Sequence, residues 1–343
     1  MKTTRFAIVG CGVIAPSHAK SIMSNPRAEL VAVCDVVKEK ADELAQTFGA
    51  AHVYTEFAEM LKRDDIDVVC ICTPSGLHAE MAVAAAEAGK HVLSEKPLDI
   101  KRDAMARMIT VCRERGVKLG CVYQRRLMPE AIAAKAAFAA GEFGKPVLCD
   151  AYLKYYRSPE YYKSAGWRGT WEMDGGGALM NQGVHGIDLL LWMAGDVKSV
   201  TARTGHLARD IEVEDTAVAL LEFGSGAFGV IEGTTSVYPA QDSRFELHGE
   251  YGSIVFSDSG FAQWRKIGDE ADSFPDVESL GIGGSSDPAA ISSKGHYLQI
   301  DDMIDAITDD RDPMVTGESA RKAVDLILAI YDSAASGKAV ELT

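Results

Sequence analysis

The sequence has no apolar run long enough to span a lipid bilayer, which argues against a transmembrane helix. The apolar stretch after Arg5 is too short for the hydrophobic region of a secretory signal, and no small-residue cleavage site follows it. The sequence also lacks internal repeats. We therefore expect a cytoplasmic protein that has no membrane partner.

Cysteine is scarce, and the chain has an odd number of cysteines. Seven occur in 343 residues, most of them in predicted strands of the first half. This usage favours reduced, buried thiols over a disulfide framework. Cys70 and Cys72 lie two residues apart in an extended run, but no second Cys or His cluster completes four ligands. The sequence thus predicts no metal site.

Positive charge is also in short supply. The chain has 35 Lys and Arg against 50 Asp and Glu, a formal net charge of -15. This balance argues against nucleic acid or an anionic membrane as a partner. Because the acidity is spread along the chain, a local pocket of Arg and Lys can still bind an anionic substrate. The length is enough for about two domains.

Residues 1–125 alternate between strand and helix patterns, which is typical of βαβ units around a parallel sheet. We interpret this region as a Rossmann dinucleotide-binding domain. Predicted strands cover residues 5–9, 29–35, 67–72, 91–94 and 117–122. Predicted helices cover about 15–24, 38–48, 55–63, 76–88 and 100–115.

The pattern changes after residue 125, where longer strand-like runs follow one another through short turns. It predicts an α+β domain at 126–343 with a large open sheet that is mostly antiparallel or mixed. Residues 268–294 are rich in Gly, Ser, Asp and Pro and predict a long surface loop. Predicted strands cover 146–157, 197–205, 215–223, 226–235, 243–249 and 252–257. Predicted helices cover 129–140, 183–194, 296–308 and 317–336.

The segment Gly10-Cys11-Gly12-Val13-Ile14-Ala15 follows the first strand and opens the first helix. It matches the G-x-G-x-x-G/A pattern, in which Gly10 permits a tight turn and Gly12 lets the backbone approach a pyrophosphate. Asp35 ends the second strand, where a carboxylate binds ribose hydroxyls and repels a 2′-phosphate. NAD is therefore favoured over NADP, although Lys38 lies nearby. The alternative is that Asp35 only caps a loop.

Glu95-Lys96-Pro97 follows the strand at 91–94, at the carboxyl edge where open α/β sheets bind ligands. An ammonium there can stabilise negative charge on an alcohol oxygen as hydride leaves, or accept the proton if its pKa is lowered. Thr73-Pro74 follows the third strand at the same edge and suits cofactor contact. His78 shares that position, but taken alone it is more typical of a helix-end or core histidine.

A glycine-rich turn at 174–177 leads into a predicted helix that carries Asn181, His185 and Asp188. If the helix begins near residue 181, the three side chains share one face. Histidine suits proton transfer near neutral pH. Asn181 could orient His185, and Asp188 could do so too or could face the core. The other interpretation is an amphipathic helix with a histidine that serves the fold alone.

Residues 152–171 are unusually aromatic and basic. Aromatic faces suit the C–H face of a sugar ring, whereas Arg and Lys suit hydroxyls, carboxylates or phosphates. About half of the tyrosines here are expected to pack under the sheet or at a subunit contact. His296 is a weaker substrate candidate. The stronger substrate-binding candidates are Tyr123, Arg126, Tyr155, Trp167 and Arg168.

Taken together, these motifs resemble the glucose–fructose oxidoreductase, inositol dehydrogenase and rhizopine-catabolism family (Gfo/Idh/MocA). The glycine loop, Thr73-Pro74 with His78, Glu95-Lys96-Pro97 and the segment from Gly175 to Asp188 occur in that family's order and spacing. The resemblance covers essentially the whole chain, including Arg126-Leu127-Met128-Pro129. It implies that the second domain binds substrate and forms homodimers or homotetramers through its sheet.

The resemblance also implies NAD(P)-dependent oxidation of a ring hydroxyl of a sugar or cyclitol, or the reverse reduction. By position, Lys96 and His185 match the family's catalytic lysine and histidine. The residue four before that histidine is often Asp in inositol dehydrogenase relatives, but here it is Asn181, which cannot stabilise an imidazolium by charge. The candidate catalytic and substrate-binding residues therefore include Lys96, Asn181 and His185. The candidate cofactor-binding residues are Gly10, Gly12, Val13, Ile14, Asp35, Thr73, Pro74, His78, Glu95, Lys96 and Gln124.

Two other functions stay open at this stage. Some relatives are glycoside hydrolases that use NAD transiently, and no feature of this sequence excludes that activity. A non-catalytic, cofactor-binding regulator is the other alternative, and the presence of both Lys96 and His185 argues against it. The identity of the sugar or cyclitol does not follow from the sequence, because loops set specificity.

Overall fold

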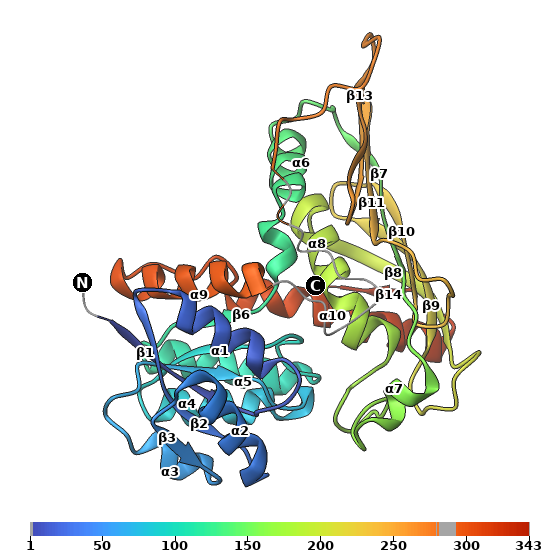
Figure 1. Ribbon diagram of the computed structural model, residues 1–343. Helices are drawn as coiled ribbons and strands as arrows, with labels where there is room; N and C mark the ends of the chain where they lie inside the picture. The colour runs from blue at the N-terminus through green and yellow to red at the C-terminus, as the bar shows by residue number, and fades with distance from the viewer. Residues whose placement is uncertain (1–2, 279, 281–292, 343) are drawn as a thin grey trace. The chain divides into compact units, whose positions relative to one another are not determined.

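The computed structural model describes residues 3–278, 280 and 293–342 (Figure 1). The chain forms two compact units, and each contains one β-sheet with its own helices. Within the described part of the chain, no helix is both long and apolar enough to cross a membrane. The predicted fold class, a Rossmann domain followed by a domain with a mixed sheet, is confirmed.

The first unit contains Met1–Gln124 together with Ser292–Arg321. The second contains Arg125–Ile291 and Lys322–Thr343. The sequence-based boundary at residue 125 thus lies beside the end of the first segment. The sequence-based division gave each domain one continuous segment, so it did not predict that residues 292–321 belong to the first unit. The assignment of substrate binding and oligomerisation to the second unit stays a prediction.

A six-stranded, fully parallel sheet forms the centre of the first unit. Its strands are β1 (Thr4–Val9), β2 (Ala28–Cys34), β3 (His52–Tyr54), β4 (Val68–Ile71), β5 (His91–Ser94) and β6 (Leu119–Cys121). The strand order is β3-β2-β1-β4-β5-β6. All four residues of β4 are buried, because helices cover both faces of a parallel sheet. The order reverses between β1 and β4, where open α/β sheets bind their ligands.

The helices of this unit connect its strands as crossovers, except α9, which comes from a later part of the chain. They are α1 (Ala15–Ser24), α2 (Lys38–Phe48), α3 (Phe57–Leu61), η1 (Ser75–Leu77), α4 (His78–Glu87), α5 (Arg102–Glu114) and α9 (Ser293–Thr308). Helix α1 contacts α9, and α4 contacts α5. Helix α2 ends at Gly49, whose φ of 73° terminates it in the left-handed conformation. Two further elements, η2 (Gln124–Leu127) and α10 (Gly317–Ser336), begin in the first unit and end in the second.

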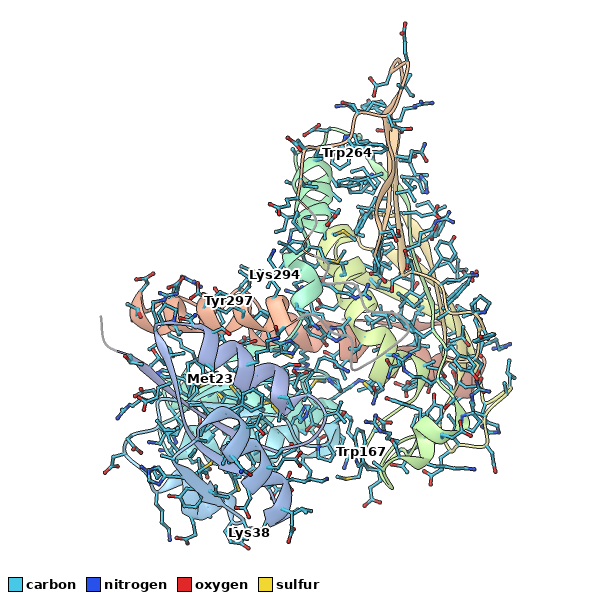
Figure 2. All side chains as sticks on the ribbon, viewed as in Figure 1. Met23, Lys38, Trp167, Trp264, Lys294 and Tyr297 are labelled. Atoms are coloured by element: carbon cyan, nitrogen blue, oxygen red, sulfur yellow. The ribbon has the colours of Figure 1, made fainter. Side chains whose placement is uncertain are left out.

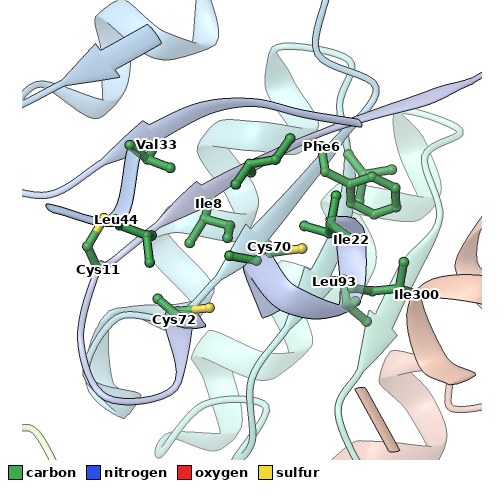
Figure 3. Close-up of a cluster of buried hydrophobic side chains, with 14 of the residues drawn as sticks. Phe6, Ile8, Cys11, Ile22, Val33, Leu44, Cys70, Cys72, Leu93 and Ile300 are labelled. Atoms are coloured by element: carbon green, nitrogen blue, oxygen red, sulfur yellow. The ribbon is translucent and has the colours of Figure 1, made fainter. Parts of the chain in front are cut away.

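The core of the first unit joins the sheet to α1 and α9 (Figure 3). Phe6 and Ile8 of β1 and Ile22 of α1 are fully buried. Ile300 of α9 completes the same cluster, although it lies far away in the sequence. Burying side chains of this size stabilises a fold by about 1.5–3 kcal/mol each. Helix α9 is therefore an integral part of the nucleotide-binding unit.

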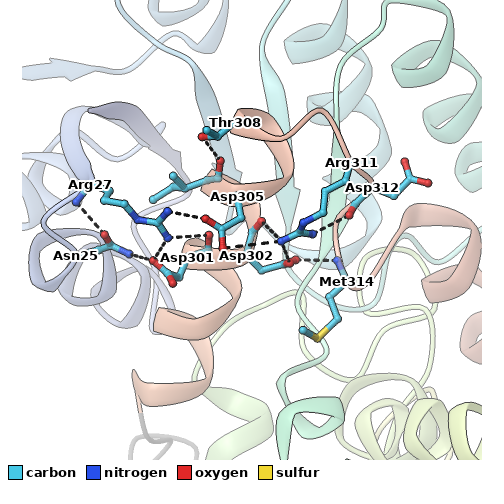
Figure 4. Close-up of polar contacts among 10 residues, drawn as sticks. Asn25, Arg27, Asp301, Asp302, Asp305, Thr308, Arg311, Asp312 and Met314 are labelled. Carbon is cyan, nitrogen blue, oxygen red and sulfur yellow. Dashed lines mark hydrogen bonds and ion pairs between the residues drawn. The ribbon is translucent and has the colours of Figure 1, made fainter. Parts of the chain in front are cut away.

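Polar contacts fix α9 at one end of β2 (Figure 4). The guanidinium of Arg27 forms ion pairs with Asp301 and Asp305, which lie one helical turn apart on α9. The side-chain amide of Asn25 also donates to Asp301 at 2.7 Å. These contacts hold α9 in register, so that its first turn, which includes His296, lies at a defined position.

The second unit is built on an eight-stranded mixed sheet with the order β13-β12-β11-β7-β10-β9-β8-β14. All neighbouring strands are antiparallel except β7 and β10. The strands are β7 (Pro146–Lys154), β8 (Val197–Gly205), β9 (Thr216–Phe223), β10 (Phe228–Thr234), β11 (Arg244–Gly249), β12 (Gly252–Ser257), β13 (Gly260–Lys266) and β14 (Val340–Glu341). The helices are α6 (Pro129–Ala139), α7 (Pro159–Lys163), the π-helical η3 (Ala178–Gly183) and α8 (Val184–Ala194).

The two faces of this sheet differ. Buried and exposed residues alternate along β9, as expected for a sheet packed on one side. The packed face contacts α8 and η3. On β9 and β10, Val218, Leu220 and Phe228 are exposed large apolar side chains.

Among the strands and α-helices of the described residues, four were missing from the sequence-based assignment: β3, α7, β13 and β14. Each is short or, like β13, carries few apolar residues, so its pattern is weak. The helix predicted at 183–194 is α8, but it starts at Val184 and continues from the π-helical segment η3. Asn181 therefore lies on η3 rather than in the first α-helical turn. Part of the loop predicted at 268–294 lies outside the described residues.

Candidate active site

The glycine loop after β1 has the geometry that a pyrophosphate requires. Gly10 has a φ of 87°, and a Cβ there would lie 2.6 Å from the backbone of Cys72, so no other residue fits. At Gly12, by contrast, a Cβ would meet nothing within 4 Å. Protein packing therefore does not require glycine at position 12, and a role for Gly12 in letting a ligand approach the backbone stays a prediction. Helix α1 begins at Ala15, directly after this loop.

Asp35 lies at the end of β2, beside the glycine loop. Its carboxylate accepts hydrogen bonds from the backbone N–H of Cys11 at 2.7 Å and of Val37 at 2.8 Å. These contacts fix the carboxylate next to the loop, where a ribose would follow the pyrophosphate. Lys38, labelled in Figure 2, is exposed and forms an ion pair with Asp42 on the same helix. Its charge is thus already partly neutralised.

The loop that carries Lys96 is anchored on both sides. The backbone N–H of Lys96 donates to Oε2 of Glu95 at 3.2 Å. His78 is buried, and its ring nitrogens lie 2.7 Å from the carbonyl oxygen of Pro97 and 2.9 Å from that of Thr73. His78 thus joins the loops that follow β4 and β5. Lys96 itself is half-buried at the carboxyl edge of the sheet.

Two buried histidines contact the carboxylate of Glu95. Its Oε1 lies 2.8 Å from Nε2 of His18 on α1 and 3.1 Å from Nε2 of His296 on α9. Burial raises the pKa of Glu95, but the two hydrogen bonds outweigh it and hold the pKa well below its usual range. Burial lowers the pKa of His18. An ionised carboxylate therefore accepts from two imidazole N–H groups, and the strand end before Lys96 is rigidly positioned.

In the second unit, Asn181 belongs to a hydrogen-bonded network. Its amide donates to the carboxylate of Asp174, which is buried. Its oxygen accepts from Nε2 of Gln182 at 2.9 Å. The other amide atom of Gln182 accepts from Arg157 at 2.7 Å. Asn181 is thus hydrogen-bonded to a carboxylate, although the side chain at position 181 is itself an amide.

His185 lies in the first turn of α8, one turn after Asn181, and is half-buried. Asp188, the third residue of the predicted face, is buried and forms a bidentate ion pair with Arg126. Of the two roles expected for Asp188, the structure shows core packing with this partner. Burial raises the pKa of Asp188, and the Arg126 hydrogen bonds oppose that change.

The aromatic and basic segment, residues 152–171, contacts the hydrogen-bonded network of Asn181. Trp167, labelled in Figure 2, lies in the loop after α7 and is half-buried. The guanidinium of Arg168 lies 4.7 Å from the Trp167 ring centroid and 4.4 Å from that of Tyr161. Arg168 also donates to the Tyr161 hydroxyl at 2.6 Å, and that hydroxyl accepts from Gln182 at 3.0 Å. The segment is therefore continuous with the residues around Asn181.

Comparison with known proteins identifies the chain's family. Residues 4–123 match the model of the oxidoreductase family with an NAD-binding Rossmann fold. Residues 131–255 match the GFO/IDH/MocA C-terminal domain. The chain belongs to the Gfo/Idh/MocA family. This membership confirms the predicted family, the NAD-binding Rossmann fold and the class of NAD-dependent oxidoreductase.

Three relatives show how far the family likeness extends. The WlbA dehydrogenase from Bordetella pertussis, solved with NADH and UDP-GlcNAcA, has 34% identity and a TM-score of 0.89, covering 100% of this chain and 99% of that one. The scyllo-inositol 2-dehydrogenase (NAD(+)) of Bacillus subtilis (strain 168) is 26% identical, over 98% of this chain and 96% of its own. The D-glucoside 3-dehydrogenase of Escherichia coli (strain K12) is 31% identical, over 75% of this chain and 70% of its own.

Several residues predicted to bind ligands in this family member have partners within the protein. The Arg126 guanidinium is buried against Asp188. Tyr155 is buried, and its hydroxyl lies 3.0 Å from Oγ of Ser243. Tyr123 and Gln124 are also buried, and His296 serves Glu95. For all of these residues, direct contact with substrate or cofactor stays a prediction. The same holds for Val13 and Ile14 of the glycine loop.

The buried residues that hydrogen-bond to the candidate site residues were not predicted from the sequence. His18 and Asp174 are examples: each is buried and hydrogen-bonded to a predicted site residue. His18 gave no local signal, because its partner Glu95 lies far away in the sequence. Asp174 stands at the start of the glycine-rich turn in the sequence, but the sequence did not show that its side chain binds Asn181.

Two groups of ligand-type side chains come together in the described residues: His18, Glu95 and His296, and, on the sheet of the second unit, Asp150, Glu246 and His248. In the first group, both Nε2 atoms lie at hydrogen-bond distance from one carboxylate oxygen. Hydrogen bonding therefore accounts for this geometry. The absence of a metal site stays a prediction.

Proposed function

We propose that the protein is an NAD-dependent dehydrogenase that oxidises a ring hydroxyl of a sugar, with a UDP-linked sugar acid as the first substrate class to test. The observation that carries this proposal is the likeness to WlbA over the whole chain at 34% identity. Lys96 and His185 occupy the family's motif positions, which supports catalysis over a purely regulatory role.

Each candidate group has a distinct chemical task in this proposal. NAD, which the glycine loop and Asp35 would hold, would supply the hydride acceptor. The Lys96 ammonium stabilises negative charge on the hydroxyl oxygen, and His185 accepts the proton. Asn181 binds a substrate hydroxyl or the imidazole, and Asp174 fixes the direction of its amide. The anchored loop around Lys96 supports this role, since catalysis requires a preorganised group.

The basic and aromatic segment favours an anionic substrate over a neutral cyclitol. Arg157, Arg168 and Arg209 all lie near tyrosine rings in the second unit. Guanidinium groups bind carboxylates and phosphates in bidentate fashion. This clustering is notable in a chain with a net charge of -15.

We also propose that the second unit forms homodimers or homotetramers through the open face of its sheet. Val218 and Leu220 alternate with buried residues along β9, and Phe228 lies opposite Glu222 on the neighbouring strand. The three side chains are 49–57% exposed. Exposed apolar side chains that share a sheet face suit a symmetric contact between copies.

The test is NADH formation by the purified protein with NAD and three substrate groups: UDP-linked sugar acids, free sugars and sugar acids, and inositols. The proposal expects turnover with a member of the first group. Activity restricted to inositols would overturn the substrate class, but not the dehydrogenase. Hydrolysis of a glycoside without net NADH would instead establish the hydrolase alternative. Binding of NAD with no turnover of any of these compounds would favour a regulator.

A further inference from the structure

A second carboxylate, Glu214, lies buried beneath the segment that carries Asn181 and His185. Its Oε2 accepts from the backbone N–H of Gly177 at 2.9 Å, and its Oε1 accepts from the backbone N–H of Leu179 at 2.8 Å. The hydroxyl of Tyr331, on α10, donates to the same Oε1 at 2.9 Å. All of these residues belong to the second unit.

The backbone of Glu214 makes a third contact with this segment. Its carbonyl oxygen accepts from the N–H of Ala178 at 2.9 Å. Three successive residues, from Gly177 to Leu179, are thus bound through one glutamate. These are the N–H groups at the start of η3, which have no partner within a helix.

The glycines of the turn are explained by this arrangement. A Cβ at Gly177 would lie 1.9 Å from the carbonyl oxygen of Glu214. A Cβ at Gly176 would lie 2.1 Å from the hydroxyl of Tyr331, and Gly176 has a φ of 155°. The glycine run therefore lets Glu214 and Tyr331 approach the backbone closely. In this chain, the glycine run allows the start of η3 to bind Glu214 and to pack against Tyr331.

We propose that Glu214 and Tyr331 are positioning residues that clamp the start of η3 and thereby set the orientation of Asn181 and His185. This inference rests on the proposed function insofar as those two side chains act on substrate. The clamp itself is a property of the fold. The clamped residues end two positions before Asn181, and η3 leads directly into α8, which carries His185.

The clamp depends on the charge of Glu214. Only N–H and O–H donors point at its carboxylate, so the ionised form satisfies every contact, whereas a protonated form must reverse or lose one. Burial raises the pKa of Glu214 to about 7 despite these hydrogen bonds. Ionisation therefore completes the clamp as the pH rises through neutrality.

Three other titratable groups face this region. Tyr331 comes from α10, Tyr162 from α7 and Asp174 from the turn. Burial raises the pKa of Tyr331 well above its ordinary value, and burial raises that of Tyr162 to about 12. Both tyrosines are neutral when Glu214 ionises. The carboxylate of Asp174 is bound by Asn181 and by the N–H of Gly169 at 2.9 Å.

Hydrogen–deuterium exchange of the full chain tests the clamp without any need for turnover. In the wild type, protection of the Gly177 and Leu179 amides, corrected for intrinsic exchange, should rise as the pH passes through about 7. Glu214→Gln should lose that rise. Glu142→Gln, which changes an exposed glutamate of the same unit, should keep it. Equal protection in Glu214→Gln and the wild type would overturn the clamp, whatever the enzyme's substrate is.

Kinetics then test the link to Asn181 and His185. Glu214→Gln should lower kcat by about tenfold above neutral pH, equivalent to the loss of one hydrogen bond to a charged group. NAD affinity should not change. Tyr331→Phe removes one donor from the carboxylate and should move the corresponding inflection of the kcat profile upward by about one pH unit. This variant also serves if Glu214→Gln fails to fold. An unmoved inflection, or an unchanged kcat in a folded Glu214→Gln, would overturn the positioning role.

Discussion

The buried carboxylate of Glu95 accepts a hydrogen bond of 2.8 Å from Nε2 of His18, on the first helix of the nucleotide-binding unit. Glu95 directly precedes Lys96, whose backbone N–H it also binds. The candidate catalytic loop is thus tied to the helix that begins at the glycine fingerprint. The positions of helix α1 and of Lys96 are therefore linked through the same buried contacts.

The burial of His18 makes the protein sensitive to acid. The pKa of His18 is lowered from 6.5 by burial, so below pH 6.5 the unfolded chain binds a proton that the folded chain resists. The free energy of unfolding should therefore decrease as the pH falls below 6.5. His18→Gln should reduce this slope and should destabilise the protein by about 1–3 kcal/mol at neutral pH. Burial also lowers the pKa of His91, so part of the slope should remain. Urea denaturation across pH measures both effects, with His206→Gln, at an exposed histidine, as the control. A slope as steep in His18→Gln as in the wild type would contradict the assignment.

Asp35 should control the choice between NAD and NADP. Asp35→Ser removes the carboxylate that we expect to bind the ribose hydroxyls, and should weaken NAD binding by about 10–100-fold while narrowing the preference over NADP. Fluorescence titration with NAD and with NADP measures the ratio of the two affinities. Lys38→Gln is the matched control and should change it little, because Lys38 is exposed and paired with Asp42. An unaltered ratio in Asp35→Ser would count against this role.

Asn181→Asp should lower activity even though it restores the residue that is common in inositol dehydrogenase relatives. The new carboxylate would face that of Asp174, and two adjacent carboxylates cannot both ionise without cost. We expect kcat to fall by about tenfold or more. The double variant Asn181→Asp/Asp174→Asn exchanges the two groups and should recover part of the loss. If the single variant is as active as the wild type, the Asp174–Asn181 pair has no role in the chemistry.

Leu220→Glu should shift the protein toward smaller assemblies. It places a charge among the exposed apolar side chains of β9 and β10, at a position that is 55% exposed. Light scattering after gel filtration measures the mass. Met23→Glu, at an exposed apolar site on α1 of the first unit, is the control and should keep the wild-type mass. A wild-type mass for Leu220→Glu would show that this part of the face is not a subunit contact.

Most strands and helices of the nucleotide-binding unit could be predicted from the sequence because their signals are local. The strands β1, β4 and β5 are short apolar runs, and the glycine loop lies between a strand and a helix. The return of α9 to this unit was not predictable, since it depends on packing between Ile300 and distant residues such as Phe6. Local patterns carry no information about such contacts.

The site shows the same division between local and distant signals. Lys96 and His185 stand in recognisable motifs, whereas Glu214 lies 37 residues from Gly177, which it binds. Gly176 and Gly177 indicated a turn before the helix, but not which residues lie against it. The π-helical form of η3 was also hidden, because the sequence of 178–183 is compatible with an ordinary helical turn.

The central claim is that Lys96 takes part in hydride transfer from a sugar, and Lys96→Ala tests it most directly. Once a substrate is found, NADH formation and NAD affinity should be measured on the same samples of the wild type and the variant. The account predicts that kcat falls by at least about 100-fold. NAD affinity should stay near that of the wild type, because the glycine loop and Asp35 are unchanged. Turnover that survives in Lys96→Ala would contradict the account.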